Sequence, residues 1–153
     1  MGNLVLVIQH AVDARRGWRR RLESRGYEAV EASSVVAGLE LLQRLPKAFR
    51  LVLVCADMPG LPGPALVETL RLLRPELPVF YLGASDAGVE VGCPSVSESG
   101  EELEMHLQAF AGTAWGETSR LSPEAVSRVR DRYGRRRDLV EAAYEVAREL
   151  PAG

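Results

Sequence analysis

LVLVCADMPGLPG, residues Leu51 to Gly63, is the stretch that decides the predicted fold. It begins with a short apolar run, Leu51 to Val54, that is rich in β-branched residues. Such a run is typical of a central strand of a parallel sheet, covered on both faces. A loop crowded with proline and glycine follows at once. In open α/β sheets, binding and catalytic groups lie just beyond the carboxyl ends of the strands, so we look for a site first at Cys55 to Met58.

Further strands and helices alternate on both sides of this stretch. Four other segments are predicted strands: Leu4–Ile8, Tyr27–Ala32, Pro78–Leu82 and, more weakly, Val89–Val91. Helices are predicted at about residues 14–25, 35–45, 64–74 and 99–110. The residues between Gly83 and Cys93 are too few for an ordinary helix. The alternation predicts an α/β structure in which helices cover both faces of a parallel sheet through right-handed crossovers.

The last part of the chain has a different pattern. Small residues at 111–118 indicate a linker, and Ser122 followed by Pro123 marks the start of a helix that Gly134 is predicted to end. A last helix is predicted from about Arg135 to Leu150. It carries an apolar seam at Leu139, Ala143, Val146 and Leu150. We therefore divide the chain into an α/β domain at residues 1–112 and a helical hairpin extension at residues 113–153.

The composition is ordinary for one globular domain of 153 residues, with 46% hydrophobic and 26% charged residues. The formal net charge of −2 argues against a generic binder of polyanions. No apolar run approaches the length needed to span a bilayer, and the N-terminus enters a strand directly, without a basic leader. We expect a cytoplasmic protein with reduced thiols and no membrane association.

From about Leu4 to Phe110 the chain resembles the receiver domain of bacterial two-component response regulators. The hexapeptide Met58-Pro59-Gly60-Leu61-Pro62-Gly63 is similar to the receiver's Met-Pro-Gly-x-x-Gly loop. Support also comes from LESRGYEAVEA at residues 22–32 and from the order of strands and loops. The resemblance implies a flavodoxin-like sheet of five parallel strands in the order 2-1-3-4-5. The fourth helix is shortened or absent here, and the hairpin is not covered.

The resemblance also implies a phosphorylation switch at the carboxyl edge of the sheet. In the family an aspartate after the third strand accepts phosphate, two acidic residues after the first strand hold Mg²⁺, and a Thr or Ser and a Lys contact the phosphoryl group. Asp57 lies two residues past the acceptor position. The matching positions of this chain hold Gln9, His10, Cys55, Gly83 and Cys93. We predict a pseudo-receiver with a degenerate pocket, no catalytic residues, no metal site and no cofactor.

Three more specific hypotheses about the pocket are less favourable than simpler ones. Cys55 is interpreted as a small apolar residue at a strand end rather than as a reactive thiol. A disulfide between Cys55 and Cys93 is not expected, because the third and fifth strands of a receiver sheet are roughly 9.5 Å apart. His10 with Gln9 and Asp57 falls short of the three protein ligands that a metal site requires.

The tail supplies candidates for interaction with partners. The block at residues 128–137 holds six arginines, among them Arg135, Arg136 and Arg137. It fits a solvated face or an acidic protein partner better than nucleic acid. The apolar seam at residues 139–150 is suited either to a homodimer or to packing against the α/β domain, and both alternatives stay open.

These observations predict a phosphorylation-independent signalling module of a bacterial regulatory pathway that acts through protein–protein interaction. We do not expect an enzyme, because no nucleophile–base pair or metal cluster is visible. The alternative is a transcription regulator with a receiver-like N-terminal domain and a DNA-binding or truncated DNA-binding C-terminal part.

Overall fold

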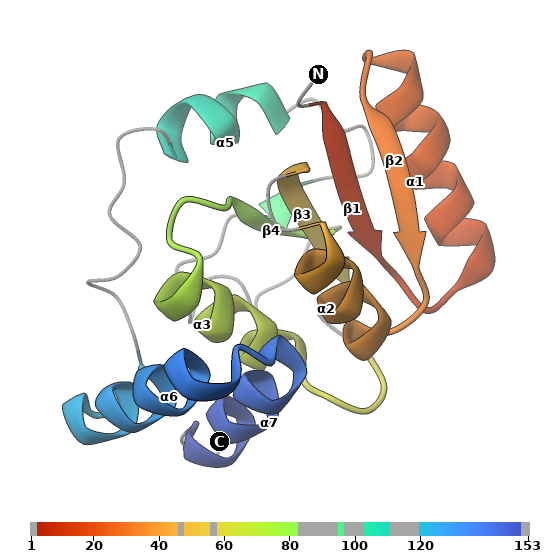
Figure 1. Ribbon diagram of the computed structural model, residues 1–153. Coiled ribbons are helices and arrows are strands. Elements are labelled where there is room, and N and C mark those ends of the chain that lie inside the picture. The colour runs from red at the N-terminus through yellow and green to blue at the C-terminus, as the bar shows by residue number, and fades with distance from the viewer. Residues whose placement is uncertain are drawn as a thin grey trace.

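A parallel β-sheet lies between helices in the computed structural model, which describes residues 3–45, 48–55, 58–82, 95–96, 103–110 and 120–150 (Figure 1). The strands pair in the order β2-β1-β3-β4-β5. They are β1 (Leu4–Ile8), β2 (Glu28–Ala32), β3 (Phe49–Cys55), β4 (Val79–Leu82) and β5 (Ser95–Val96). The predicted order is confirmed for the first four strands, and the two-residue β5 joins the sheet beside β4.

The fifth strand does not lie where the sequence predicted it. Tyr81 pairs with Ser95 and Leu82 pairs with Val96, so the strand beside β4 follows Cys93 instead of preceding it. The strand that pairs with β4 is therefore not the one predicted at Val89–Val91, whose residues lie outside the described part of the chain. Cys93 was predicted to follow the fifth strand directly, but it precedes β5 in the sequence and lies outside the described residues.

Alternate residues of each strand face opposite sides of the sheet, and each side has its own apolar core. Val5 and Val7 of β1 pack with Trp18 and Leu22, which belong to α1 (Val12–Ser24), and with Leu103 at the start of α5 (Leu103–Phe110). Leu6 and Ile8 face the other side, towards α2 (Val35–Arg44) and α3 (Gly63–Leu73). The strands read as continuous apolar runs because both of their faces are buried.

A helical hairpin forms an additional layer outside α2 and α3 (Figure 1). Its helices are α6 (Pro123–Arg136) and α7 (Leu139–Glu149). The Ser122 hydroxyl caps α6 by accepting the Ala125 N–H at 3.2 Å, as its position before Pro123 predicts. The Asp138 carboxylate caps α7 by accepting the N–H groups of Val140 and Glu141 at 3.0 and 3.2 Å. Only Arg137 and Asp138 therefore connect the two helices.

The hairpin turn corrects a second prediction. Gly134 was expected to end the first helix, but α6 continues through it to Arg136. The helix ends at Arg137, which adopts a left-handed conformation with φ 55° and donates its N–H to the Tyr133 carbonyl. The predicted last helix consequently begins four residues later than expected, at Leu139.

The apolar seam of α7 is buried within the chain. Leu139, Ala143 and Val146 have no exposed surface, and Leu150 packs beside them, in the same core as α2 and α3. Of the two alternatives for the seam, the structure has the one in which it packs against the α/β domain. The hairpin and the receiver-like part thus share one core, although the predicted boundary at residues 112 and 113 lies outside the described residues.

The hairpin buries the outer side of α3 as well. Gly63 and residues 65–72 of α3 are all buried, including the polar side chains of Glu68, Thr69 and Arg71. The Glu68 carboxylate accepts the Arg120 N–H at 3.1 Å, and its Oε1 lies 3.9 Å from Nη1 of Arg71. Because Arg120 lies three residues before α6, this hydrogen bond fixes the point at which the chain enters the hairpin.

Residues 83–94 lie outside the described part of the chain, so the shortened or absent fourth helix stays a prediction. None of the described helices is both long enough and apolar enough to cross a membrane.

Candidate functional site

The carboxyl ends of β1 and β3 form the edge at which the sequence predicted a site. Ile8 pairs with Val54, and the next residues along the two strands are Gln9 and Cys55. The structure therefore brings two of the predicted pocket residues to the same level of neighbouring strands. Asp57, Gly83 and Cys93 lie outside the described residues, and their part in the predicted pocket stays a prediction.

Gln9 is buried, and hydrogen bonds engage its backbone and its side chain. Its N–H donates to the Ala32 carbonyl at 3.1 Å, which extends the pairing of β1 with β2 by one residue. Its side-chain oxygen accepts the Ala11 N–H at 3.2 Å, and its carbonyl accepts from Nη1 of Arg15 at 2.9 Å. Ala11 is the N-cap residue of α1 and has no capping side chain of its own. Gln9 therefore joins the end of β1 to the start of α1.

His10 and Cys55, the other two described residues of the predicted pocket, differ in exposure. The His10 side chain is exposed, whereas Cys55 is half-buried, packs against the core on the α2 and α3 side and is a free thiol. No group of three or more His, Cys, Asp or Glu side chains suited to a metal ion occurs in the described ranges.

The loop after β3 is shaped by one glycine and two buried anchors. Gly60 has φ +86°, a conformation that residues with a side chain rarely adopt. Met58 and Leu61 are buried on either side of it, and Pro62 precedes the first turn of α3. The loop thus folds onto the core at both of its apolar positions.

A charged network flanks this edge on the β2 side. Glu31 of β2 accepts from Nε of Arg15 and from Nη1 of Arg19, both at 3.0 Å. Partial burial by itself raises the pKa of Glu31, but the hydrogen bonds from Arg19 and Arg15 outweigh it and hold the pKa below its usual value. The pKa of Arg19 is raised, first by its hydrogen bond to Glu23 and then by that to Glu31. The network ties α1 to the edge strand of the sheet.

A second candidate surface lies on the hairpin, where α6 and α7 are joined by a ladder of ion pairs. Arginines four residues apart on α6 face glutamates four residues apart on the antiparallel α7. The rungs are Arg128 with Glu149, Arg132 with Glu145 at 2.5 Å, and Arg136 with Glu141 at 2.7 Å. Half of the six arginines of the basic block are therefore paired with glutamates of α7.

The three predicted interaction candidates of this block have different surroundings. Arg135 pairs with Asp131 on its own helix, and Arg136 forms the ladder rung next to the turn. Arg137 is exposed, and its carbonyl accepts a hydrogen bond from Nε2 of Gln43 at 2.9 Å, which joins the turn to α2. The three arginines were predicted as one group, but each has a different partner in the structure.

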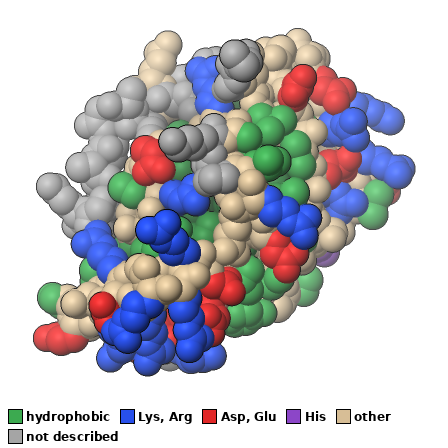
Figure 2. All heavy atoms as spheres, in the orientation of Figure 1, with side chains coloured by type: hydrophobic (Ala, Val, Ile, Leu, Met, Phe, Trp, Pro, Cys, Tyr) green, Lys and Arg blue, Asp and Glu red, His purple; other side chains and the backbone are tan. Residues whose placement is uncertain are grey.

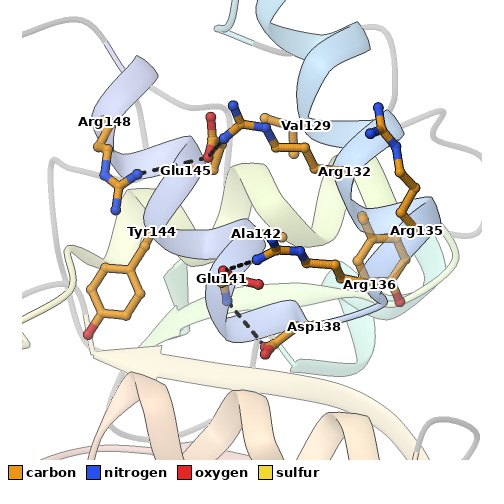
Figure 3. Close-up of a pocket in the computed structure, with 11 residues that line it drawn as sticks. Val129, Arg132, Arg135, Arg136, Asp138, Glu141, Ala142, Tyr144, Glu145 and Arg148 are labelled. Atoms are coloured by element: carbon orange, nitrogen blue, oxygen red, sulfur yellow. Dashed lines mark hydrogen bonds and ion pairs between the residues drawn. The ribbon is translucent and has the colours of Figure 1, made fainter.

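A hollow of about 480 Å³ lies on the outer side of the hairpin (Figure 3). We call it the hairpin hollow. Its lining combines apolar, aromatic and charged side chains from both helices: Val129, Arg132, Tyr133, Arg135, Arg136, Asp138, Glu141, Ala142, Tyr144, Glu145 and Arg148. The ladder rungs formed by Arg132 and Arg136 are part of this lining, so the hollow and the ladder form one surface.

Solved structures of receiver domains share this fold. A receiver domain from Clostridium thermocellum has a TM-score of 0.62 and 20% identity, and the match covers 72% of this chain and 94% of that chain. One from Methanospirillum hungatei gives 0.61, with 20% identity and coverage of 72% and 98%. The chain has the receiver fold. The receiver domain of the hybrid histidine kinase CckA gives 0.55, with 23% identity and coverage of 70% and 97%.

Among curated protein sequences, the chain is similar to one part of a larger protein. The chain is 34% identical over 85 residues to the sensor kinase CckA of Brucella abortus, which is 54% of this chain and 9% of that kinase. The chain thus spans about a tenth of the length of the curated relative it matches. No family model matches the chain.

The ion-pair ladder was not predicted, although the spacing of charged residues in the sequence indicates it. Arg128, Arg132 and Arg136 recur every four residues, and so do Glu141, Glu145 and Glu149. In an antiparallel hairpin this spacing aligns each arginine with a glutamate. The hairpin was predicted, but its arginines were grouped as one stretch of sequence. Their four-residue spacing, which places three of them on the same face of the helix, was not used. The ladder connects α6 and α7, which pack outside α2 and α3 of the receiver fold.

Proposed function

We propose that the chain is a signalling module of the two-component type that acts through protein–protein interaction without accepting a phosphoryl group. The observation that supports this most strongly is the environment of Gln9. At a position where the receiver resemblance implies a carboxylate for Mg²⁺, the side-chain oxygen of Gln9 accepts the Ala11 N–H instead. That group is used to hold the start of α1.

The chemistry of the neighbouring groups points the same way. Mg²⁺ prefers carboxylate oxygens and near-ideal octahedral geometry. Gln9 and His10 offer an amide and an exposed imidazole after β1, and Cys55 offers a thiol at the end of β3. Neither an amide nor an imidazole neutralises the charge of the cation, and a thiol does not replace the carboxylate that receives phosphate. The loop anchored by Met58 and Leu61 keeps its folded shape without these groups.

The test is chemical phosphorylation of the full chain. The protein is incubated with acetyl phosphate and Mg²⁺, and its intact mass is measured, with a receiver that keeps the acidic residues as the positive control. We expect the control to gain a phosphoryl group and this chain to gain none. A modified peptide that contains Asp57 or another carboxylate of the same edge would overturn the proposal.

Matched variants test whether the missing carboxylates are the reason. Cys55→Asp alone is expected to stay unmodified, since Gln9 and His10 still supply no carboxylate for Mg²⁺. The triple variant Gln9→Asp, His10→Asp, Cys55→Asp is expected to bind Mg²⁺, measured by titration calorimetry against the wild-type chain. Mg²⁺ binding by the wild type equal to that of the triple variant would contradict this explanation.

The alternative function, a transcription regulator that binds DNA through its C-terminal part, receives less support. Three of the six arginines in the basic block form ion pairs with α7 instead of facing outward as a row of unpaired cations. A DNA-binding assay at several salt concentrations tests it, and tight, salt-dependent binding would favour it over the proposal.

A further inference from the structure

The hairpin is a locally positive region of a negative chain. Residues 120–150 contain eight arginines and six acidic residues, which gives a net charge of +2, whereas the whole chain has −2. Figure 2 shows arginine side chains gathered over the α6 and α7 end of the molecule, with acidic groups among them. This end therefore attracts an acidic partner, as does α1, which carries five arginines and two acidic residues.

Among the residues that line the hairpin hollow, guanidinium groups outnumber carboxylates. Arg132, Arg135, Arg136 and Arg148 line it, against three acidic residues. One of those three, Asp138, already accepts two N–H groups at the start of α7. Because Arg135 pairs with Asp131 and Arg136 pairs with Glu141, the capacity for a further carboxylate lies with the arginines that share Glu145.

Glu145 shows where that capacity lies. Its carboxylate, only 14% exposed, is approached by Arg132 at 2.5 Å, by Arg148 at 3.9 Å and by Arg128 at 4.0 Å. Arg148 makes one of the long contacts and is 75% exposed. It can turn towards an incoming carboxylate while Glu145 keeps its bond to Arg132.

An exposed aromatic ring lies next to this arginine. Tyr144 is 42% exposed and projects from α7 on the same side as Arg148, away from α6 (Figure 3). Val129 and Ala142 supply buried apolar surface to the lining. Tyrosine and arginine side by side are the residue types that contribute most to protein interfaces, because one covers apolar groups and the other pairs with carboxylates.

We propose that the hairpin hollow is the docking surface for an acidic, partly apolar segment of a partner protein. A carboxylate of this segment pairs with Arg148, and an apolar side chain covers the Tyr144 ring. A nucleic acid fits less well, since Glu141 and Glu145 within the lining repel an unbroken row of phosphates but leave room for spaced carboxylates. This inference rests on the proposed function, because it names the surface through which the module meets its partner.

The experiment measures fluorescence anisotropy with the full chain and two labelled probes. One probe is an acidic helical peptide with glutamates four residues apart and leucines on the adjacent face, and the other is duplex DNA. We expect the peptide to bind at low salt, more tightly than the DNA. Arg148→Glu combined with Tyr144→Ala should weaken peptide binding about tenfold. Circular dichroism of the variant checks that the hairpin is folded.

The matched control is Arg16→Glu, which makes the same charge change at an exposed arginine of α1. We expect it to change peptide affinity less than about twofold, since the charge is remote from the hollow. Equal losses for control and hollow variant, tighter binding of DNA, or no peptide binding at all would overturn the inference. Phosphorylation at the carboxyl edge would instead overturn the proposed function and leave the peptide result standing, so the two failures are distinguishable.

Discussion

At the scale of single residues, Gly38 shows how closely α2 approaches the sheet. A Cβ added at Gly38 would lie 2.4 Å from Cδ1 and 2.9 Å from Cγ1 of Ile8, which is fully buried in β1. We predict that Gly38→Ala lowers the free energy of unfolding by about 1–3 kcal/mol, because the buried Ile8 side chain or the α2 backbone has to shift to admit the methyl group. Urea denaturation measures the change.

The chain offers a matched control for this substitution. Gly134 also lies within a helix, α6, but an added Cβ would meet nothing within 4 Å. Gly134→Ala should therefore raise the free energy of unfolding by about 0.5–1 kcal/mol through helix propensity alone. If both alanine variants changed stability in the same direction, the close contact of Gly38 with Ile8 would not be the cause.

The ion pairs of Glu31 make the stability of the fold depend on pH. Its pKa is lower in the folded chain than in the unfolded one, so its contribution to stability is present above the unfolded value, near pH 4, and is lost as the pH falls through the folded value. Glu31→Gln should therefore destabilise the protein at neutral pH, and the difference from wild type should shrink as the pH falls below the unfolded value, near pH 4. Urea midpoints from pH 7 to about pH 3 measure it, with Glu28→Gln on the same strand as the control.

At the scale of elements, we expect burial to determine the relative strength of the ion pairs in the α6–α7 ladder. Glu145 is 14% exposed, whereas Glu141 is 57% exposed, so solvent screens the Arg136–Glu141 rung more. Double-mutant cycles with alanine should give a coupling free energy of about 1 kcal/mol for Arg132 with Glu145 and about 0.3 kcal/mol for Arg136 with Glu141. The reverse order would show that exposure does not determine the strength of these pairs.

Which elements could be predicted from the sequence depended on how much local signal each one carries. β1, β3 and β4 are buried on both faces, so each is an apolar run that stands out from its neighbours. β5 has only two residues, too few for any periodicity, and the apolar Val89–Val91 was chosen in its place. In α6 the glycine suggested an end, but Arg137 supplies the left-handed turn, and an arginine gives no signal for that conformation.

The candidate site was predictable to a similar degree. That Gln9 and Cys55 lie side by side at the carboxyl edge follows from two strand ends, which apolar runs define. The hydrogen bond from Ala11 to Gln9 depends on how α1 begins, and nothing in the local sequence specifies it. The hairpin hollow requires two helices in a particular register, which the sequence indicates only through the four-residue spacing of opposite charges.

At the scale of the whole molecule, the hairpin and the sheet share one core, and we expect them to unfold together. Leu139 is fully buried between the hairpin and the receiver-like part. Leu139→Ala should lower the free energy of unfolding by about 2–5 kcal/mol. Hydrogen exchange should show the same loss of protection in β1 as in α7, because the transition is cooperative.

The control for this substitution is Leu45→Ala, at an exposed leucine just after α2. It removes the same atoms and should cost less than about 1 kcal/mol. Faster exchange confined to α6 and α7 in the Leu139 variant, with β1 unchanged, would mean that the hairpin detaches as a separate unit.

The burial of α3 also has a consequence for synthesis on the ribosome. β1 to β4 and α3 are complete once residue 82 has been added, but the described residues that cover the outer side of α3 belong to the segment 120–150. At about 5–20 residues per second, roughly several seconds separate the two events. During that interval the nascent chain presents the apolar side of α3 to solvent, and we expect chaperones that recognise exposed hydrophobic segments to bind it then.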